Sequence, residues 1–179
     1  MIGLPGHHVI AVAIEAEVAR TRLSPGDLSQ PLSSGFLLFL AGWLGLEPGT
    51  LDVVLAATGV ADPQVELWRR DDLGAHPRVV RAGRFRPDLT VYADRATGEP
   101  DGVVVIGRGL ASRWEMAFEV AEPARGRGLG RRLAASARTL VPPDEPLFAQ
   151  VAPGNASSLR SVLAAGFRPI GSEVLFASS

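Results

Sequence analysis

Residues 115–132 read EMAFEVAEPARGRGLGRR, and the fold is inferred from this stretch outward. Its first part alternates, with Met116, Phe118 and Val120 on one face and the odd-numbered residues on the other. This period of two is typical of a β-strand. The Glu-Pro pair at 122–123 ends the strand, a glycine-rich turn follows, and a helical run then begins. The stretch therefore predicts a strand, a tight turn and a helix in direct succession.

The glycine-rich turn is suited to bind an anion. Backbone N–H groups at a helix N-terminus lack partners inside the helix, and the helix dipole adds partial positive charge there. Glycines let the backbone approach the anion without a Cβ in the way. Four arginines add full charges, at Arg125, Arg127, Arg131 and Arg132. The pattern indicates a phosphate-binding site.

Three kinds of phosphate-binding loop contain such glycines. A P-loop ends in Gly-Lys-Ser/Thr, and this chain contains no Lys. A dinucleotide-binding fingerprint needs G-x-G-x-x-G early in a βαβ unit, whereas here G-x-G-x-G lies late in the chain. The spacing Arg-x-x-Gly-x-Gly, at Arg125, Gly128 and Gly130, instead resembles the acyl-CoA-binding motif of the GNAT superfamily of N-acetyltransferases. A plain glycine turn before a helix is the alternative interpretation.

A second segment, residues 155–167, resembles the other signature of that superfamily. The signature has an Asn, a small residue three positions later, an aromatic residue (usually Tyr) at seven, and Gly-Phe at eleven and twelve. Asn155, Ser158 and Gly166-Phe167 fall in register, whereas Val162 stands at the usual Tyr position. The segment also has the marks of a helix, because Asn155 suits an N-cap and a glycine follows its last turn.

The composition argues against several classes of protein. The chain has 179 residues and a net charge of −1, so neither a nucleic-acid partner nor an anionic membrane surface is indicated. It contains no Cys and three His, and no metal site is predicted. The N-terminus lacks the positive region of a signal peptide, and the longest apolar run, 36–46, is too short to span a bilayer. We therefore expect a soluble, cytoplasmic protein.

Hydrophobic periodicity predicts a helical N-terminal part over residues 1–75. Helices are expected over 9–23, 36–46 and 51–58, with a strand over 9–14 as the rival to the first. The run 36–46 is apolar all round, so we expect it to be buried in the core or in a dimer interface.

From residue 76 the pattern favours strands. They are expected over 79–84, 89–92, 103–106, 114–121, 147–151 and 167–177, with helices after the glycine turn and over 155–165. This order predicts an α/β fold with a mixed sheet and helices on both faces. Residues 1–75 and 76–179 are expected to form one compact domain overall.

The resemblance implies a GNAT-like acyl-CoA-binding core at 76–179. It implies that acetyl-CoA, as acyl-donor substrate, lays its pantetheine arm along the strand 114–120 and its pyrophosphate on the N–H groups of 127–132. The strand 147–151 is expected to splay away and open a slot for the thioester. The cofactor-binding residues that follow are Phe118, Val120, Arg125, Gly126, Arg127, Gly128, Leu129, Gly130, Arg131, Arg132 and Asn155, the last chiefly as a helix cap.

The implied reaction moves an acetyl or other acyl group from acyl-CoA to an amine of a small molecule or peptide. A base must take a proton from the attacking amine. Glu115 is the first candidate, because it lies ten residues before Arg125, close to where several relatives keep a glutamate. Glu119 lies on the same face of the strand as Glu115 and is the second candidate for the base. Because Val162 replaces the usual Tyr, the alternative function is a non-catalytic acyl-CoA-binding or sensor module of the same fold.

Overall fold

The computed structural model describes residues 1–178, which fall into two compact units. The first unit comprises Met1–Val54 and the C-terminal residues from Ile170 on, and the second comprises Leu55–Pro169. Two strands, β4 (Asp52–Thr58) and β10 (Arg168–Glu173), each run from one unit into the other. The boundary predicted at residue 75 falls inside the second unit. Among the described residues, no helix is long and apolar enough to cross a membrane.

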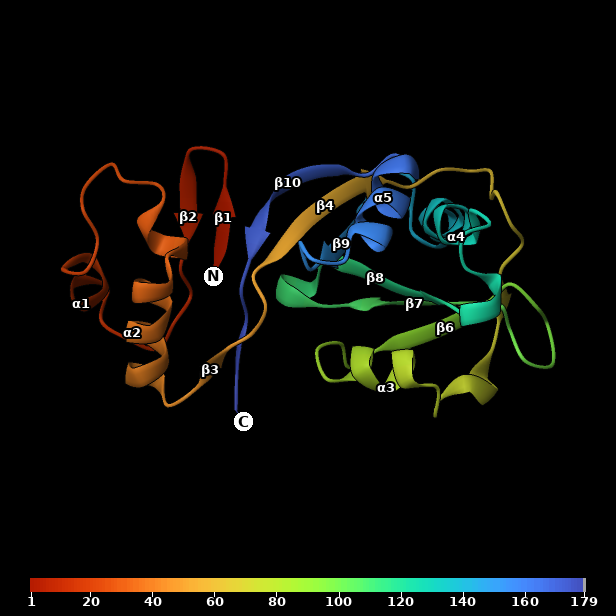
Figure 1. Cartoon of the computed structure of the whole chain (residues 1–179), viewed down its shortest axis with the longest axis horizontal. Coiled ribbons are helices and arrows are strands. Elements are labelled where there is room, and N and C mark those ends of the chain that lie inside the picture. The colour runs from red at the N-terminus through yellow and green to blue at the C-terminus, as the bar shows by residue number, and fades with distance from the viewer. Residues whose placement is uncertain (179) are drawn as a thin grey trace. The chain divides into compact units, whose positions relative to one another are not determined.

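The first unit holds short strands and the helices α1 and α2 (Figure 1). Its elements are β1 (Ile2–Leu4), β2 (His7–Val9), α1 (Ala16–Arg20), the 3-10 helix η1 (Gln30–Leu32), α2 (Ser34–Leu44), β3 (Glu47–Pro48) and β11 (Phe176–Ala177). β1 pairs antiparallel with β2 and with β10, and β3 pairs antiparallel with β11. Met1, Ala19, Phe36, Leu40 and Val174 form its buried core.

The helix predicted over 36–46 is confirmed as α2, but it is buried on one side only. Ser33 caps it by accepting a hydrogen bond from the Phe36 N–H, and Gly45 ends it in the left-handed region. Phe36 and Leu40, one turn apart, are buried, whereas Leu38 and Trp43 are 65% and 56% exposed. The prediction that the core buries the whole helix is therefore wrong. The alternative of a dimer interface stays a prediction.

Three other expectations about secondary structure are wrong. The segment 51–58, predicted as a helix, is the strand β4, in which the consecutive residues Val54 and Leu55 are both buried. The segment 79–84, predicted as a strand, lies in the helix α3 (Pro77–Gly83). Pro77 occupies the first position of α3 and His76 Nδ1 accepts from the Arg78 N–H at 3.1 Å. Of the helix predicted over 9–23, only α1 forms.

The second unit is built on a mixed sheet in the order β4-β9-β8-β7-β6-β5. Its strands are β5 (Trp68–Arg69), β6 (Leu89–Ala93), β7 (Gly102–Arg108), β8 (Trp114–Val120) and β9 (Pro146–Val151). β5, β6, β7 and β8 pair antiparallel in turn, and β8 pairs parallel with β9. Short 3-10 helices, η2 (Asp71–Leu73), η3 (Leu110–Ser112), η4 (Glu122–Ala124) and η5 (Arg138–Leu140), lie between the longer elements.

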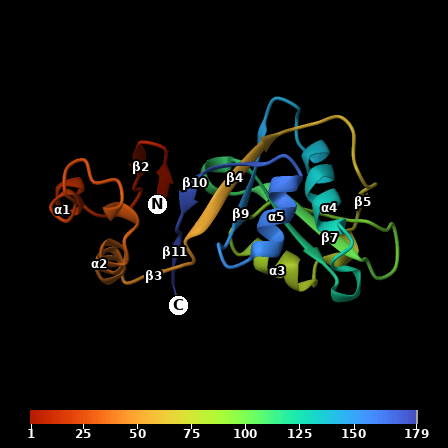
Figure 2. The same ribbon diagram turned by 45° about the horizontal axis from the view of Figure 1, so that its top comes forward.

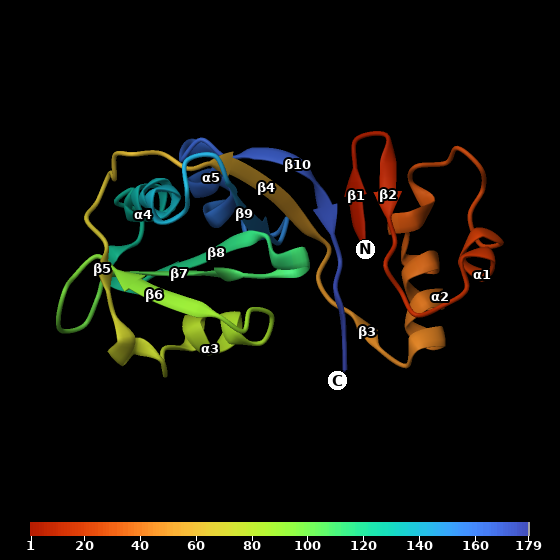
Figure 3. The ribbon, with the colours of Figure 1, turned by 180° about the vertical axis from the view of Figure 1, so that it is seen from behind.

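Helices cover both faces of this sheet, as the order of elements predicted. α4 (Leu129–Ala137) and α5 (Ala156–Ala164) contact each other on one face, and α3 packs on β6, β7 and β8 on the other (Figures 2 and 3). Val79 and Ala82 of α3 join Val91, Val103 and Val105 in a buried cluster against which Ala117 packs. The odd-numbered side chains of β8 therefore face α3, and the even-numbered ones face α4 and α5.

Candidate functional site

The strands β8 and β9 separate along their length. Their parallel register pairs Trp114 with Leu147, and the last pair is Met116 with Ala149. β8 nevertheless continues to Val120, paired with β7 all the way. From Ala117 onward, the described residues provide no ladder partner on the β9 side of β8. Backbone groups at such an edge can pair with an amide-bearing ligand. The predicted splay of the strand 147–151 is confirmed.

The turn after β8 owes its shape to glycines with positive φ. Gly126 and Gly128 have φ angles of 77° and 76°, which residues with a Cβ rarely adopt. Gly128 is the N-cap of α4, and the first ladder bond runs from the Arg132 N–H to its carbonyl at 3.2 Å. The N–H groups of the first turn, from Leu129 to Arg131, thus have no partner within the helix.

Gly130 has a different reason to be glycine. A Cβ at this position would lie 3.2 Å from the ring of Phe118 and 3.1 Å from Ser161 Oγ. The absence of a side chain lets the first turn of α4 approach both β8 and α5. This close approach places the free N–H groups of α4 beside the open edge of β8.

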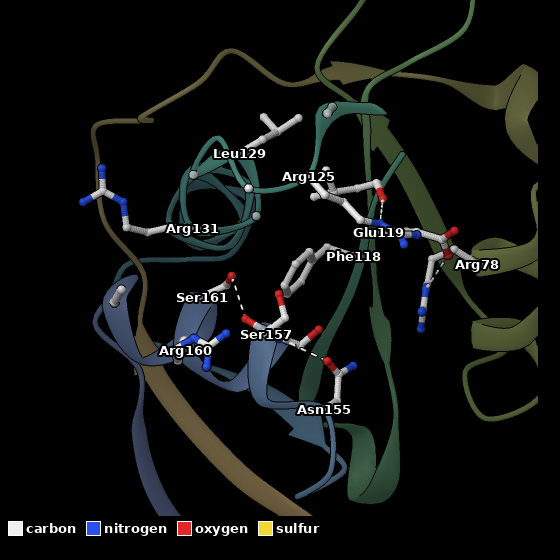
Figure 4. Close-up of a pocket in the computed structure, with 17 residues that line it drawn as sticks. Arg78, Phe118, Glu119, Arg125, Leu129, Arg131, Asn155, Ser157, Arg160 and Ser161 are labelled. Atoms are coloured by element: carbon white, nitrogen blue, oxygen red, sulfur yellow. Dashed lines mark hydrogen bonds and ion pairs between the residues drawn. The ribbon is translucent and has the colours of Figure 1, made fainter. Parts of the chain in front are cut away.

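A cavity of about 610 Å³ lies over the turn, the open edge of β8 and the start of α5 (Figure 4). Nine of the eleven residues predicted to bind the cofactor line it: Phe118, Val120, Arg125, Gly126, Gly128, Leu129, Gly130, Arg131 and Asn155. Arg127 and Arg132 are outside the lining, and the Arg132 guanidinium donates to the Arg127 carbonyl at 3.2 Å. The two predicted motifs therefore meet at one cavity.

The cavity is strongly positive. Its ionisable lining consists of one carboxylate, that of Glu119, and four guanidinium groups, those of Arg78, Arg125, Arg131 and Arg160. Arg78 Nε lies 3.3 Å from Glu119 Oε2, an ion pair that Figure 4 marks. The lining side chains thus carry a net charge of +3, which favours an anionic ligand.

One face of α5 forms the remaining wall. Asn155 caps the helix by accepting from the Ser158 N–H at 3.1 Å, and the Ser161 hydroxyl donates to the Ser157 carbonyl at 3.0 Å. Ser161 lines the cavity, whereas Val162, at the position of the family Tyr, is fully buried. Several lining residues were not predicted: Arg78, Ala124, Ser157, Ser158, Arg160, Ser161 and Ala164. Positions 157, 161 and 164 share one helix face, a signal that the sequence contained. Arg78 was missed because its segment was predicted as a strand.

The two carboxylates of β8 lie in different surroundings. Glu115 is 4% exposed, and its oxygens accept from Arg86 Nε at 2.9 Å, from Arg113 Nε at 2.8 Å and from the Leu110 N–H at 3.2 Å. A Cβ at Gly109 would overlap this carboxylate, so a glycine is required there. Glu115 is outside the lining of the cavity, whereas Glu119 belongs to it and is partly exposed.

The sequence matches no family model and no curated protein. Its fold, however, is similar to those of solved acetyltransferases. A GNAT-family acetyltransferase from Colwellia psychrerythraea superposes with a TM-score of 0.52 at 10% identity, over 82% of this chain and 63% of that one. A GCN5-related N-acetyltransferase from Kribbella flavida gives 0.51 at 16% identity, over 79% and 63%. The chain thus spans less than two thirds of the length of either structure.

These similarities define the class of fold. The strand, glycine turn and helix predicted from residues 115–132 are all present, and the mixed sheet carries helices on both faces. The chain has the fold of the GNAT acetyltransferases, as its two motifs predicted.

Proposed function

We propose that this protein is an acyltransferase that moves an acetyl or other acyl group from acyl-CoA to an amine of a small molecule or peptide. The observation that carries the proposal is the positive cavity where the open edge of β8 meets the N-terminus of α4. A CoA ester presents a pyrophosphate, an amide-bearing arm and a thioester in that order. The cavity and the adjoining point where β8 and β9 part offer groups suited to each of the three in the same order.

The pyrophosphate is assigned to the turn. The first turn of α4, with its free N–H groups, lines this end of the cavity, and Arg125 and Arg131 are among the lining residues. Glycines at 126 and 128 let the backbone approach the phosphate oxygens. Arg125 is held in place because its Nε donates to the Val120 carbonyl at 3.1 Å.

The pantetheine arm is assigned to the open edge of β8, where Phe118 and Val120 line the cavity. Its amides would pair with backbone groups that have no ladder partner on β9. The arm then leads toward the point where β8 and β9 converge, from Val120 to Ala117. That distance is three residues of extended chain, roughly 10 Å. The thioester is thus assigned to the slot between the two strands.

Acyl transfer from a thioester to an amine requires few protein groups. The amine nitrogen attacks the thioester carbonyl carbon, a C–N bond forms, the C–S bond breaks, and CoA leaves as a thiolate that takes up a proton. We assign the base that accepts the amine proton to Glu119, because this carboxylate lies in the cavity. Both oxygens of Glu115, the first candidate from the sequence, already accept hydrogen bonds from arginines. With Val162 buried, solvent is assigned as the proton source for the thiolate.

A non-catalytic acyl-CoA-binding module is the second candidate function. The buried Val162 favours it, because a valine side chain in the core stands where the family usually presents a Tyr hydroxyl to the thiolate. Calorimetric titration with acetyl-CoA and a thiol-release assay over a panel of amines distinguish the two. Binding with release of CoA thiol supports the acyltransferase, and binding without release from any amine supports the module. Failure of both CoA and acetyl-CoA to bind contradicts both.

A further inference from the structure

Gln150 of β9 has a buried amide nitrogen without a hydrogen-bond partner among the described residues. An amide NH₂ group carries two donors, and most buried donors in proteins are paired. Trp114 Nε1 is the other such atom, but Trp114 stands at the start of β8, with its ring stacked under Arg108 at 3.7 Å. Gln150 lies elsewhere, at the point where the strands diverge.

The orientation of the Gln150 amide is set by its neighbour. Arg86 Nη2 donates to Gln150 Oε1 at 3.1 Å. A guanidinium can only donate, so the group that faces it has to be the oxygen, and the NH₂ group is directed away from Arg86. The amide cannot reverse without placing two donors against each other.

Arg86 is itself held by a chain of charged side chains, in which Glu115 is buried and Arg113 is partly buried. Its Nε donates to Glu115 Oε2 at 2.9 Å, and the other oxygen of Glu115 accepts from Arg113 Nε at 2.8 Å. The Arg113 guanidinium also lies 4.9 Å from the centre of the Phe148 ring, two residues before Gln150 on β9. Glu115 therefore acts as a positioning residue, which orients Gln150 through Arg86.

The position of Gln150 relates this amide to the slot. The last pair between the two strands is Met116 with Ala149, so Gln150 is the first residue of β9 beyond the ladder, and Ala117 is its counterpart on β8. Glu115 pairs with Phe148, so Gln150 lies on the same face as Glu115 and Glu119. Gln150 is outside the lining of the cavity, but its place in the register puts it at the closed end of the slot, where the proposed function assigns the thioester.

We propose that Gln150 Nε2 donates a hydrogen bond to the carbonyl oxygen of the acyl thioester, a role that rests on the proposed function. The same donor stabilises the negative charge that this oxygen gains when the amine attacks. A thioester carbonyl is an acceptor without a donor of its own, which complements an NH₂ group whose oxygen partner is already engaged. Gln150 is thereby assigned to recognition of the acyl group rather than of CoA.

Two ligands that differ only in the carbonyl test the proposal on the full chain. S-ethyl-CoA is the thioether in which a CH₂ group replaces the C=O of acetyl-CoA. Calorimetry is expected to show that the wild type binds acetyl-CoA about tenfold more tightly than S-ethyl-CoA. Gln150→Leu is expected to remove this preference and to leave the affinity for S-ethyl-CoA unchanged.

A second variant keeps the contact with Arg86, so that a loss of preference cannot be caused by a folding defect. Gln150→Glu retains an oxygen for Arg86 but presents no donor, so it is expected to lose the same preference. Gln64→Leu makes the matched change at an exposed glutamine outside the cavity and is expected to behave as the wild type.

The outcomes separate this inference from the proposed function. If the wild type binds both ligands equally, or if Gln150→Leu retains the preference, the role of Gln150 is overturned while the acyltransferase stands. If Gln150→Leu weakens both ligands by the same factor, the residue is structural and the inference is equally overturned. If the wild type binds neither ligand, the proposed function itself fails.

Discussion

Arg78 of α3 and Glu119 of β8 form an ion pair in the wall of the cavity, with 3.3 Å between Nε and Oε2. The two residues are 41 positions apart and are brought together because α3 packs on the face of β8 that carries Glu119. The guanidinium offsets the negative charge of the carboxylate beside a ligand that is itself negative. A carboxylate in the cavity wall can accept a proton from an amine.

The first prediction concerns this carboxylate. Glu119→Gln retains its size but cannot accept a proton, so turnover is expected to fall by about two to four powers of ten, the usual contribution of a general base. The rate of thiol release under saturating acetyl-CoA measures the effect, and calorimetry is expected to show an unchanged affinity for acetyl-CoA. Glu66→Gln, at an exposed position outside the cavity, is the control. Wild-type turnover in Glu119→Gln would exclude this residue as the base.

The glycine turn provides the second prediction. Gly128→Asp would add a side chain at a φ of 76° and place a negative charge against the phosphates. The affinity for CoA is expected to fall by about a hundredfold or more, because free N–H groups and a helix dipole would face a carboxylate instead. Gly98→Asp imposes the same change at another positive-φ turn, with open space around it and no part in the cavity. Calorimetry that finds equal affinities for CoA in the two variants would refute the phosphate assignment.

The arginines of the cavity should make binding depend on salt. Arg131→Gln and Arg160→Gln each remove a positive charge from the lining, so each is expected to weaken CoA binding by about three- to tenfold at low ionic strength. The loss should shrink as salt is raised, because screening weakens the interactions that remain in the wild type. Arg81→Gln, on α3 but outside the lining, is expected to change neither the affinity nor its salt dependence.

The fourth prediction concerns the buried carboxylate of Glu115. Glu115→Gln would remove the counter-charge shared by the buried Arg86 and the partly buried Arg113, and the free energy of unfolding is expected to fall by about 3–5 kcal/mol. Urea denaturation followed by circular dichroism measures the loss. Glu17→Gln breaks the exposed pair with Arg20 and is expected to cost at most about 0.5 kcal/mol.

The same variant also tests whether Glu115 positions Gln150. Under conditions where Glu115→Gln stays folded, the preference for acetyl-CoA over S-ethyl-CoA should diminish. An effect on stability without any effect on this preference would show that Glu115 supports the fold alone.

The sequence by itself determined the elements whose signals are local. The strand period of 115–120, the glycines before α4 and the cap at Asn155 each depend on residues within one turn or one strand. Positive φ at Gly126 and Gly128 is a property of those residues, so the turn could be predicted without a partner. The fold and most of the cavity lining followed from these two motifs.

Only the tertiary structure decided which carboxylate faces the cavity. Glu115 and Glu119 have the same place in the strand period, but the partner of Glu115 is Arg86, 29 residues away in the chain. Its second partner, Arg113, is two residues away, but the distant ion pair with Arg86 leaves no local pattern. The same holds for β4, because its apolar run suits a helix as well as a strand until its neighbours in the sheet are known. It also holds for Gln150, because the sequence does not show where β8 and β9 part or that the NH₂ group of this residue has no partner among the described residues.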